Sequence, residues 1–555
     1  MQKRLFLAAF ICLALMLVQS VFFPPSLPPA EADLSAKREA DKVPEEQILL
    51  AGIPSELAPG GRAAVGLSPE KVARIEHRVA NDLMAVDLSN AGFGMIRNVE
   101  PTLDKFADKE GRGVDFLLLD DEHTLEFGFV ANDTDFAWAR RPREVVAKDD
   151  SSLTLRESTG EVEVTQKFRI LEGYEAVYEV TVKNTSEGEQ FHRIRVRNRL
   201  GEPTDTSRYN VHRGLCRTVE DMEDFDRDDV EEAPERIMGG DGFAGVDWIG
   251  LDSNYFLAAL VPDGEPFTAC EVSADMGSGG RPTLVNTGIG RKASLKPGES
   301  KSYRFGLYLG AKEPERLRSF AAVQTETLEE AVDWGYFGVV SEFLGKKMLA
   351  LLQWFHDLTG IWGVAIIMLT ICVKLVLLPL TLKQYRSMRK MREIQPEMEA
   401  LRKKYGDDKQ KEYAEMQALW KRSGASPLSG CLPVFMQFPV WIALYAMLGT
   451  AVGLYHEPFL WLTDLTMPDS WFILPIGMGG LMFLQMRIQP QAGDSQQQRM
   501  MQWIMPLVFP AMMWFMPSGL GVYIFANLVL SLIQSFIQIR PDKEWKKKKQ
   551  EAAGN

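Results

Sequence analysis

The sequence predicts a membrane α-helical bundle of six transmembrane helices, five of them forming a core, joined to an all-β sandwich domain and a cytoplasmic helical hairpin. Three observations support this fold class. Several apolar stretches approach the length of about 20 residues that crosses a bilayer. Apolar and polar residues alternate in many segments between about 110 and 310, as they do in strands with one buried face. Basic residues gather in only some of the loops between the apolar stretches.

Charge divides the 555-residue chain into two unlike parts. Residues 24–333 hold 37 Lys and Arg against 59 Asp and Glu, a net charge of −22, whereas the rest holds 25 against 16, a net charge of +9. The chain therefore joins an acidic soluble part to a basic membrane part. The acidic part carries no basic patch of the kind that binds nucleic acid.

The N-terminus, residues 1–23, predicts a transmembrane anchor, because a nearly continuous apolar run at Leu5–Phe23 follows two basic residues. The alternative is a cleaved signal peptide, for which Ala30-Glu31-Ala32 offers a small-x-small cleavage pattern. That pattern lies beyond several prolines and past the apolar run, which favours an uncleaved anchor. Residues 24–55 are rich in Pro, Ala and Glu and predict a flexible linker.

Residues 56–333 predict an exported β-sandwich. Apolar residues alternate with polar ones in Val162–Ile170, Tyr178–Lys183 and Lys301–Gly310. His123, His192 and His212 are scattered and have no metal-binding or catalytic spacing, so we interpret them as structural. The sequence predicts no catalytic residue, no metal site and no cofactor.

The cysteines are too few for a disulfide scaffold. Cys216 and Cys270 are the only two in the acidic domain, and they could pair in an oxidising compartment. The sequence does not decide whether they do.

Residues 334–357 predict an amphipathic helix that lies in the outer membrane interface. Its apolar residues recur at intervals of three and four: Phe343, Leu344, Met348, Leu351, Leu352 and Phe355. The alternative is an ordinary core helix of the sandwich domain.

The core, residues 358–540, contains five predicted spans: 361–382, 431–452, 471–488, 501–516 and 519–539. The loop 383–430 holds twelve Lys and Arg, and the segment after Ile539, which includes the basic tail 541–555, holds six, whereas the loop 453–470 holds none. Because cytoplasmic loops carry the excess of basic residues, both termini are predicted to be cytoplasmic and 24–360 to be outside.

Residues 383–428 predict a hairpin of two helices on the cytoplasmic side. A coiled-coil-like stripe runs through Met388, Met391, Ile394, Met398, Leu401 and Tyr405, and Gly406-Asp407-Asp408 breaks it before a second helix. Its many basic residues could meet anionic lipid, ribosomal RNA or an acidic partner. The alternative is a solvated, charged surface without a partner.

Lys374 is the only charged residue in the span 361–382. A lysine near mid-membrane costs roughly 2.5–3.5 kcal/mol on insertion scales, so it usually faces a polar cavity. The alternative is that its side chain snorkels to the cytoplasmic surface. Thr370 shares its helix face, and we expect Gln437, Tyr523 and Asn527 to line the same cavity. Each alone is an ordinary interhelical hydrogen-bonding group, and together with a lysine they favour a hydrated pocket.

Several motifs resemble those of the YidC-type membrane protein insertases. They are Ser426-Pro427-Leu428-Ser429-Gly430-Cys431-Leu432-Pro433, Gln437-Phe438-Pro439, Ala443-Leu444-Tyr445, Pro379-Leu380-Thr381, Gln395-Pro396, Gly406-Asp407-Asp408 and Met516-Pro517-Ser518-Gly519. The resemblance covers about 335–540, and the outer domain is similar to that of the Gram-negative members in length and position. Many bacterial members carry arginine where Lys374 stands, so a mechanism that needs a guanidinium fork would not apply here.

The resemblance implies an insertase that inserts integral membrane proteins and helps them fold, without being an enzyme. It implies a five-helix core with a hydrophilic groove, a galactose-mutarotase-like outer sandwich and an inner-membrane location in a Gram-negative bacterium. The implied partners are nascent membrane proteins, the Sec translocon, the ribosome and membrane lipids, with no small-molecule cofactor. Two alternatives are a secondary transporter with a carbohydrate-binding periplasmic domain, which should show inverted repeats, and an anchored sugar-modifying enzyme.

Overall fold

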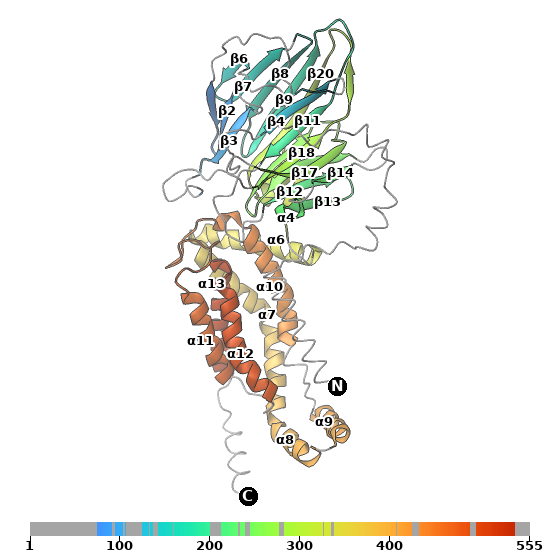
Figure 1. Ribbon diagram of the computed structural model, residues 1–555. Coiled ribbons are helices and arrows are strands. Elements are labelled where there is room, and N and C mark those ends of the chain that lie inside the picture. The colour runs from blue at the N-terminus through green and yellow to red at the C-terminus, as the bar shows by residue number, and fades with distance from the viewer. Residues whose placement is uncertain are drawn as a thin grey trace. The chain divides into compact units, whose positions relative to one another are not determined.

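The described chain consists of a β-sandwich followed by a set of long helices (Figure 1). The computed structural model describes residues 75–90, 95–103, 106, 125–131, 134–136, 143–158, 160–199, 212–230, 234–238, 245–276, 282–325, 327–334, 338–406, 408–423, 432–488 and 496–538. The predicted anchor at 1–23, the linker at 24–55 and the tail at 541–555 lie outside these residues.

The larger sheet of the sandwich has nine antiparallel strands in the described residues, in the order β13-β12-β15-β16-β20-β9-β8-β7-β6. They are β6 Glu144–Asp149, β7 Ser152–Ser158, β8 Val162–Ile170, β9 Glu175–Asn184, β12 Arg213–Thr218, β13 Met222–Asp226, β15 Val246–Asp252, β16 Phe256–Pro262 and β20 Ser300–Ala311. The predicted alternation is confirmed in β8, where Val164, Phe168 and Ile170 are buried while Lys167 and Arg169 are exposed.

The second sheet has six strands in the order β14-β17-β18-β11-β4-β5. They are β4 Leu125–Ala131, β5 Thr134–Phe136, β11 Ile194–Arg199, β14 Glu235–Met238, β17 Ala269–Met276 and β18 Pro282–Ile289. Smaller sheets are formed by β1 Glu76–Ala80, β2 Met84–Ser89 and β3 Ile96–Pro101, and by β10 Gln190–His192 with β19 Ala293–Leu295. Short helices are α4 Arg227–Val230, α5 Pro314–Arg318 and η2 Leu328–Ala331.

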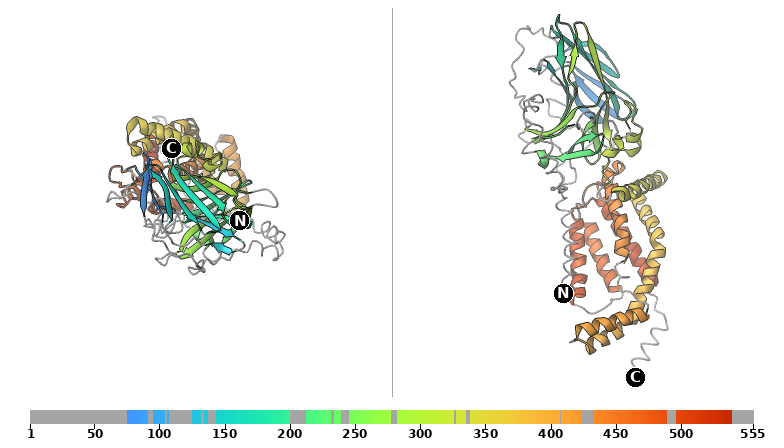
Figure 2. Two further views of the ribbon diagram at one scale, coloured as in Figure 1. Left: turned by 90° about the horizontal axis from the view of Figure 1, so that it is seen from above. Right: turned by 90° about the vertical axis from the view of Figure 1, so that its right-hand side faces the viewer.

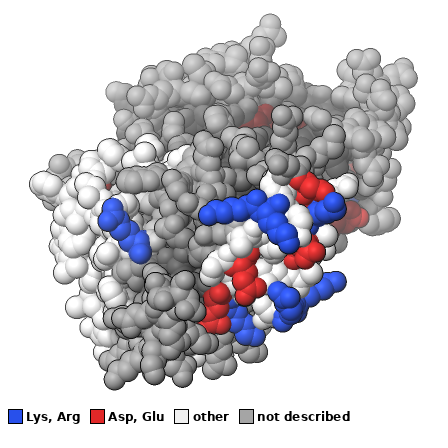
Figure 3. Space-filling view, turned by 90° about the horizontal axis from the view of Figure 1, so that it is seen from below, with Lys and Arg blue, Asp and Glu red and all other residues white. Residues whose placement is uncertain are grey.

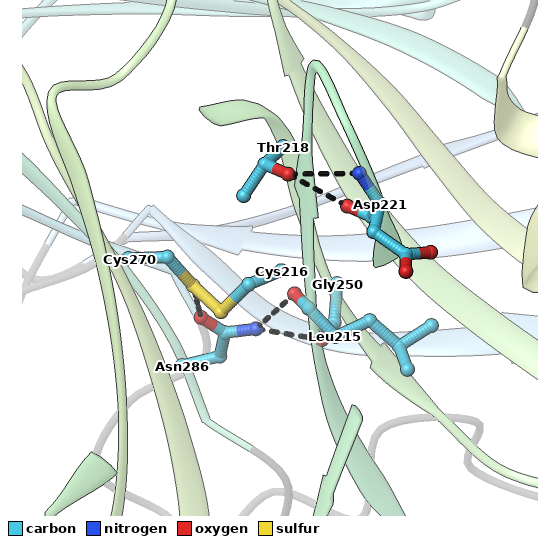
Figure 4. Close-up of a disulfide and its surroundings, with 7 residues drawn as sticks. All are labelled: Leu215, Cys216, Thr218, Asp221, Gly250, Cys270 and Asn286. Carbon is cyan, nitrogen blue, oxygen red and sulfur yellow. Dashed lines mark hydrogen bonds between the residues drawn. A yellow bond between two sulfur atoms is a disulfide. The ribbon is translucent and has the colours of Figure 1, made fainter. Parts of the chain in front are cut away.

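A disulfide between Cys216 and Cys270 joins the two sheets, because Cys216 lies on β12 and Cys270 on β17 (Figure 4). Beside it, the Asn286 side chain on β18 donates to the carbonyl oxygens of Leu215, at 2.7 Å, and Gly250, at 2.8 Å, on the opposite sheet. Asn286 and both cysteines are fully buried. The question that the sequence left open is therefore answered: the two cysteines are paired.

Among the other buried polar residues of the sandwich, Asp252 and His192 have close side-chain partners. Asp252, at the end of β15, bonds Lys312 at 2.7 Å and Arg213 at 2.6 Å, and both Asp252 and Lys312 are almost fully buried. His192 Nε2 lies 2.7 Å from the Tyr303 hydroxyl, and burial, with a smaller effect from Lys301, lowers its pKa to about 4. His192 is thus a neutral structural group at neutral pH.

The helical part begins with α6 Gly338–Thr359, slightly later than the predicted 334–357. One face packs against the protein and includes Met348, Leu352 and Phe355, which are buried. Phe343 lies on another face that is exposed, together with Trp354 and Leu358. The apolar residues of the predicted stripe are thus divided, because Met348, Leu352 and Phe355 face the protein whereas Phe343 does not.

The remaining helices are α7 Trp362–Glu393, α8 Gln395–Lys404, α9 Lys409–Ser423, α10 Leu432–Thr450, α11 Ile473–Ile488, α12 Gln496–Met513 and α13 Ser518–Gln538, with a short 3-10 turn, η4 Val452–Leu454. Helix α7 continues past the predicted span end at 382 to Glu393, so the two-helix hairpin begins at Gln395 and not at 383. Pro396 explains the break, because proline is accepted in the first turn of a new helix but not in the interior of a continuing one.

Two described helical segments are long and apolar enough to cross a membrane, Trp362–Leu382 and Ser518–Ile537. Pro439–Thr450 and Ile473–Arg487 are shorter apolar helices. Helix α7 packs against α6 and α13, and α13 also packs against α11. Figure 2 shows the orange and red helices of this region running side by side.

The loop between α10 and α11 is fixed to the start of α13. The Ser518 hydroxyl donates to the Asp464 carbonyl oxygen at 2.8 Å, and the Gly519 N–H donates to the Leu465 carbonyl oxygen at 2.7 Å. Within the loop, the Asp469 carboxylate accepts from the Leu474 N–H at the start of α11. These bonds order the loop end of the helical part.

Candidate functional site

Lys374 lies near the middle of α7, half-buried, on the face that packs against α13. Its ammonium donates to the Ser531 hydroxyl oxygen on α13, with a distance of 2.6 Å between Nζ and Oγ. The neighbouring apolar side chains Leu375 and Val376 point away from the protein and are 62% and 72% exposed. Helix α7 therefore has one face suited to lipid and one polar face directed at α13.

Polar residues on α13 recur at intervals of three and four, which places them on one helix face. The Ser531 hydroxyl donates to the Asn527 carbonyl oxygen at 2.7 Å, and the Ser535 hydroxyl donates to the Ser531 carbonyl oxygen at 2.8 Å. About two turns beyond Lys374 toward the end of α7, the Gln534 amide donates to the Thr381 hydroxyl at 3.1 Å. Two side-chain hydrogen bonds thus join α7 to α13.

The other predicted site residues are not bonded to the Lys374 side chain in the described part of the chain. Thr370 is fully buried, and its hydroxyl donates to the Ile366 carbonyl oxygen of its own helix at 2.7 Å. Tyr523 is buried on α13, and Asn527 is half-buried there. The side chain of Gln437 lies outside the described residues. The structure thus links Lys374, Ser531 and the Asn527 backbone directly.

Sequence reasoning did not identify Ser531, the partner of Lys374. Serine is common in membrane helices and gives a weak signal on its own. The available signal was the regular spacing of Asn527, Ser531 and Ser535, which marks a polar stripe on an otherwise apolar helix.

The charge of Lys374 has no acidic partner in the described part of the chain. Among the described residues, none of the ion pairs within 4.0 Å includes Lys374. Within the same residues, no group of three or more His, Cys, Asp or Glu could hold a metal ion. The feature of the site is therefore a positive charge beside a neutral acceptor, in a helix whose other charged residues all lie beyond Leu382.

Helices α8 and α9 form a small separate hairpin. Ile394, Met398, Met416 and Leu419 make its buried core. Its surface carries charges of both signs, as Figure 3 shows from below, and they include the ion pair of Arg422 with Glu397 at 3.6 Å. Of the basic residues predicted for this hairpin, five lie at 383–392, in the last turns of α7, so the hairpin itself is less basic than the sequence range suggested.

Comparison with known proteins identifies the family. A family model described as 60Kd inner membrane protein matches residues 354–546, and one described as YidC periplasmic domain matches residues 76–348. A membrane protein insertase YidC of Anaeromyxobacter dehalogenans strain 2CP-C is 32% identical over 558 residues, which is 97% of each chain. The chain belongs to the YidC family of membrane protein insertases. A second YidC, from strain 2CP-1 of that species, is 36% identical over 411 residues, 72% of this chain and 71% of its own.

Among solved structures, an active YidC insertase crystal structure with the first transmembrane domain resolved is 19% identical and covers 85% of this chain and 95% of its own, with a TM-score of 0.37. Because this score is low, the family assignment depends on the sequence matches. As a YidC-family protein, the chain is a membrane protein insertase of the inner membrane with a periplasmic domain. These matches give no support to the transporter alternative.

Proposed function

We propose that this insertase moves polar client segments part-way across the membrane through a hydrophilic groove that contains Lys374. The observation that carries the proposal is the unneutralised lysine in the middle of α7, bonded to Ser531 and flanked by lipid-suited residues. Thr370, Gln437, Tyr523 and Asn527 are proposed to line the same groove. A client segment in the groove would meet a positive charge, whereas a segment in the hydrocarbon interior of the bilayer would meet no charged group.

The energetics favour this route for acidic segments. An Asp at the centre of a membrane helix costs about 3 kcal/mol on insertion scales. A nearby cation in a poorly solvated site offsets part of that cost, because the attraction between opposite charges is stronger there than in water. Burial of the client's apolar helix in lipid then drives the rest of the insertion. No covalent step is needed, so we infer that the protein is not an enzyme.

We further propose six spans, with both termini in the cytoplasm and the sandwich in the periplasm. The twelve basic residues of 383–430 support this orientation, because basic loops remain inside. The Cys216–Cys270 disulfide supports it independently, since such bonds persist in an oxidising compartment. The bonds of Ser518 and Gly519 to the loop 453–470 support an outer end of the groove that is closed.

The hairpin of α8 and α9, with the basic end of α7, is proposed to meet partners on the cytoplasmic side. Its chemistry suits anionic lipid headgroups and the ribosome. The Sec translocon is proposed as a second partner, on the strength of the family resemblance. The exposed apolar face of α6, with Phe343, Trp354 and Leu358, is proposed to lie in the outer leaflet.

Reconstitution tests the central proposal. Purified full-length protein in liposomes should insert a client that has one apolar helix and two Asp in its translocated segment, measured as protease protection of that segment. Empty liposomes, and liposomes containing the Lys374→Leu variant at the same level, serve as controls. Equal protection with Lys374→Leu and with the unchanged protein would refute a role for the charge.

A further inference from the structure

The hydrogen bond between Lys374 and Ser531 has a direction that the structure determines. The Ser531 hydroxyl has one proton, and it is used in the bond to the Asn527 carbonyl oxygen at 2.7 Å. Its oxygen is therefore left to accept, and it faces Lys374 Nζ at 2.6 Å. The hydroxyl dipole thus points its negative end at the ammonium, as suits a charge-assisted hydrogen bond.

Ser531 and Lys374 lie at the same depth. Lys374 is twelve residues after the start of α7 at Trp362, and Ser531 is thirteen after the start of α13 at Ser518. At 1.5 Å per residue these distances are about 18 Å and 20 Å along the two helix axes. A lysine without such an acceptor would extend toward the nearer polar surface. The bond to Ser531 keeps the ammonium at this depth.

A serine holds the ammonium without cancelling its charge. An aspartate or glutamate at the same place would form an ion pair and compete with any acidic client. An ammonium has three donors, and the Ser531 oxygen accepts from one of them, so two remain for water or a client carboxylate. The hydrogen bond between Gln534 and Thr381 joins the same two helices further toward their C-terminal ends, so the bond to Ser531 is not the only link between α7 and α13.

We propose that Ser531 is a positioning residue, which fixes the Lys374 ammonium in the groove as an unneutralised charge and so makes the insertase favour clients with acidic translocated segments. This inference rests on the function proposed above for Lys374. It assigns to Ser531 an effect on client selectivity, which a purely structural serine would not have.

The test compares two clients in proteoliposomes of the full-length protein. They are identical except that the two Asp of the translocated segment in one are Asn in the other. Ser531→Ala should lower insertion of the Asp client roughly three- to tenfold, about the net value of one ordinary hydrogen bond, and leave the Asn client nearly unchanged. Ser531→Thr keeps the hydroxyl and should restore the preference. Ser531→Asp should pair with Lys374 and lower insertion of the Asp client to the level of Lys374→Leu.

Ser535→Ala is the matched control. It removes a hydroxyl from the same helix face, but that hydroxyl donates to the Ser531 carbonyl oxygen. It should leave the ratio of the two clients unchanged. In the Lys374→Leu background, Ser531→Ala should have no further effect, because a positioning residue acts only through the group that it positions.

Two results would overturn the inference in distinguishable ways. If Lys374→Leu abolishes the preference for the Asp client while Ser531→Ala, at equal membrane level, keeps it, Ser531 does not position the charge, and the proposed function stands. If Lys374→Leu itself keeps the preference, both the role of the charge and that of Ser531 are wrong. An equal loss for both clients in Ser531→Ala would show a merely structural role and would also overturn it.

Discussion

Removal of the inter-sheet disulfide should destabilise the periplasmic sandwich substantially. The bond between Cys216 and Cys270 closes a loop with a sequence separation of 54 residues. The chain-entropy relation for a loop of this length gives about 4 kcal/mol at 25 °C. For a domain of this size, that corresponds to a fall in melting temperature of about 8–16 °C. The double substitution Cys216→Ala, Cys270→Ala should show this fall.

The assay is thermal unfolding of the full-length protein in detergent, followed by the temperature at which the sandwich becomes sensitive to protease. Cys372→Ala, on α7, is the matched control and should leave this temperature unchanged. Thiol counting tests the premise. Of the five cysteines, three should react with a maleimide in denatured, non-reduced protein and all five after reduction.

Two observations would refute this reasoning. Five reactive thiols before reduction, in protein taken from its native compartment, would mean that the bond does not form. A disulfide that forms but whose removal shifts the melting temperature by less than about 2 °C would mean that Asn286 and the packed core hold the sheets together without it.

Three further predictions concern the sandwich and the topology. His192 has a pKa of about 4 in the folded state, below its unfolded value near 6.5. Its contribution to the free energy of unfolding is therefore complete above pH 6.5 and is lost as the pH falls toward 4, a loss of about 3 kcal/mol. His192→Gln should flatten the measured pH dependence of the free energy of unfolding. Asp252→Ala should lower the free energy of unfolding, measured by chemical denaturation, by about 3–5 kcal/mol, because the buried Lys312 loses its carboxylate partner. A denaturation midpoint equal to that of the unchanged protein would contradict this. Protease added to spheroplasts should cleave within the sandwich and spare 383–430, and cleavage of 383–430 from outside would contradict the topology.

The strands were the most predictable part of the fold. In β8 the alternation of apolar and polar residues identified the strand bounds, because one face is buried and the other meets water. The pairing of Cys216 with Cys270 could not be predicted, because it depends on how β12 and β17 approach across the sandwich. No local pattern encodes that approach.

The helical site was predicted in part. Lys374 could be identified from the sequence because it is a single charge in an apolar run. A lysine in a membrane span raises the free energy of insertion, so such a residue usually has a functional role. Ser531 was missed, because the choice of partner depends on which helix lies next to α7, and that is decided by packing between segments more than 150 residues apart. The extension of α7 to Glu393 was missed for a different reason. The predicted bound at 382 is where the apolar composition ends, whereas the helix continues through polar residues until Pro396 interrupts it.

A charge exchange between insertase and client tests the central claim most directly. In proteoliposomes, Lys374→Glu should insert the client with two Asp at least tenfold less than the unchanged protein, and Lys374→Arg should insert it nearly as well, because the sign of the charge is kept. If the two Asp of the client are replaced by Lys, insertion by Lys374→Glu should recover and that by the unchanged protein should fall. Insertion of the Asp client by Lys374→Glu at the level of the unchanged protein would contradict the claim that the charge of Lys374 attracts acidic client segments.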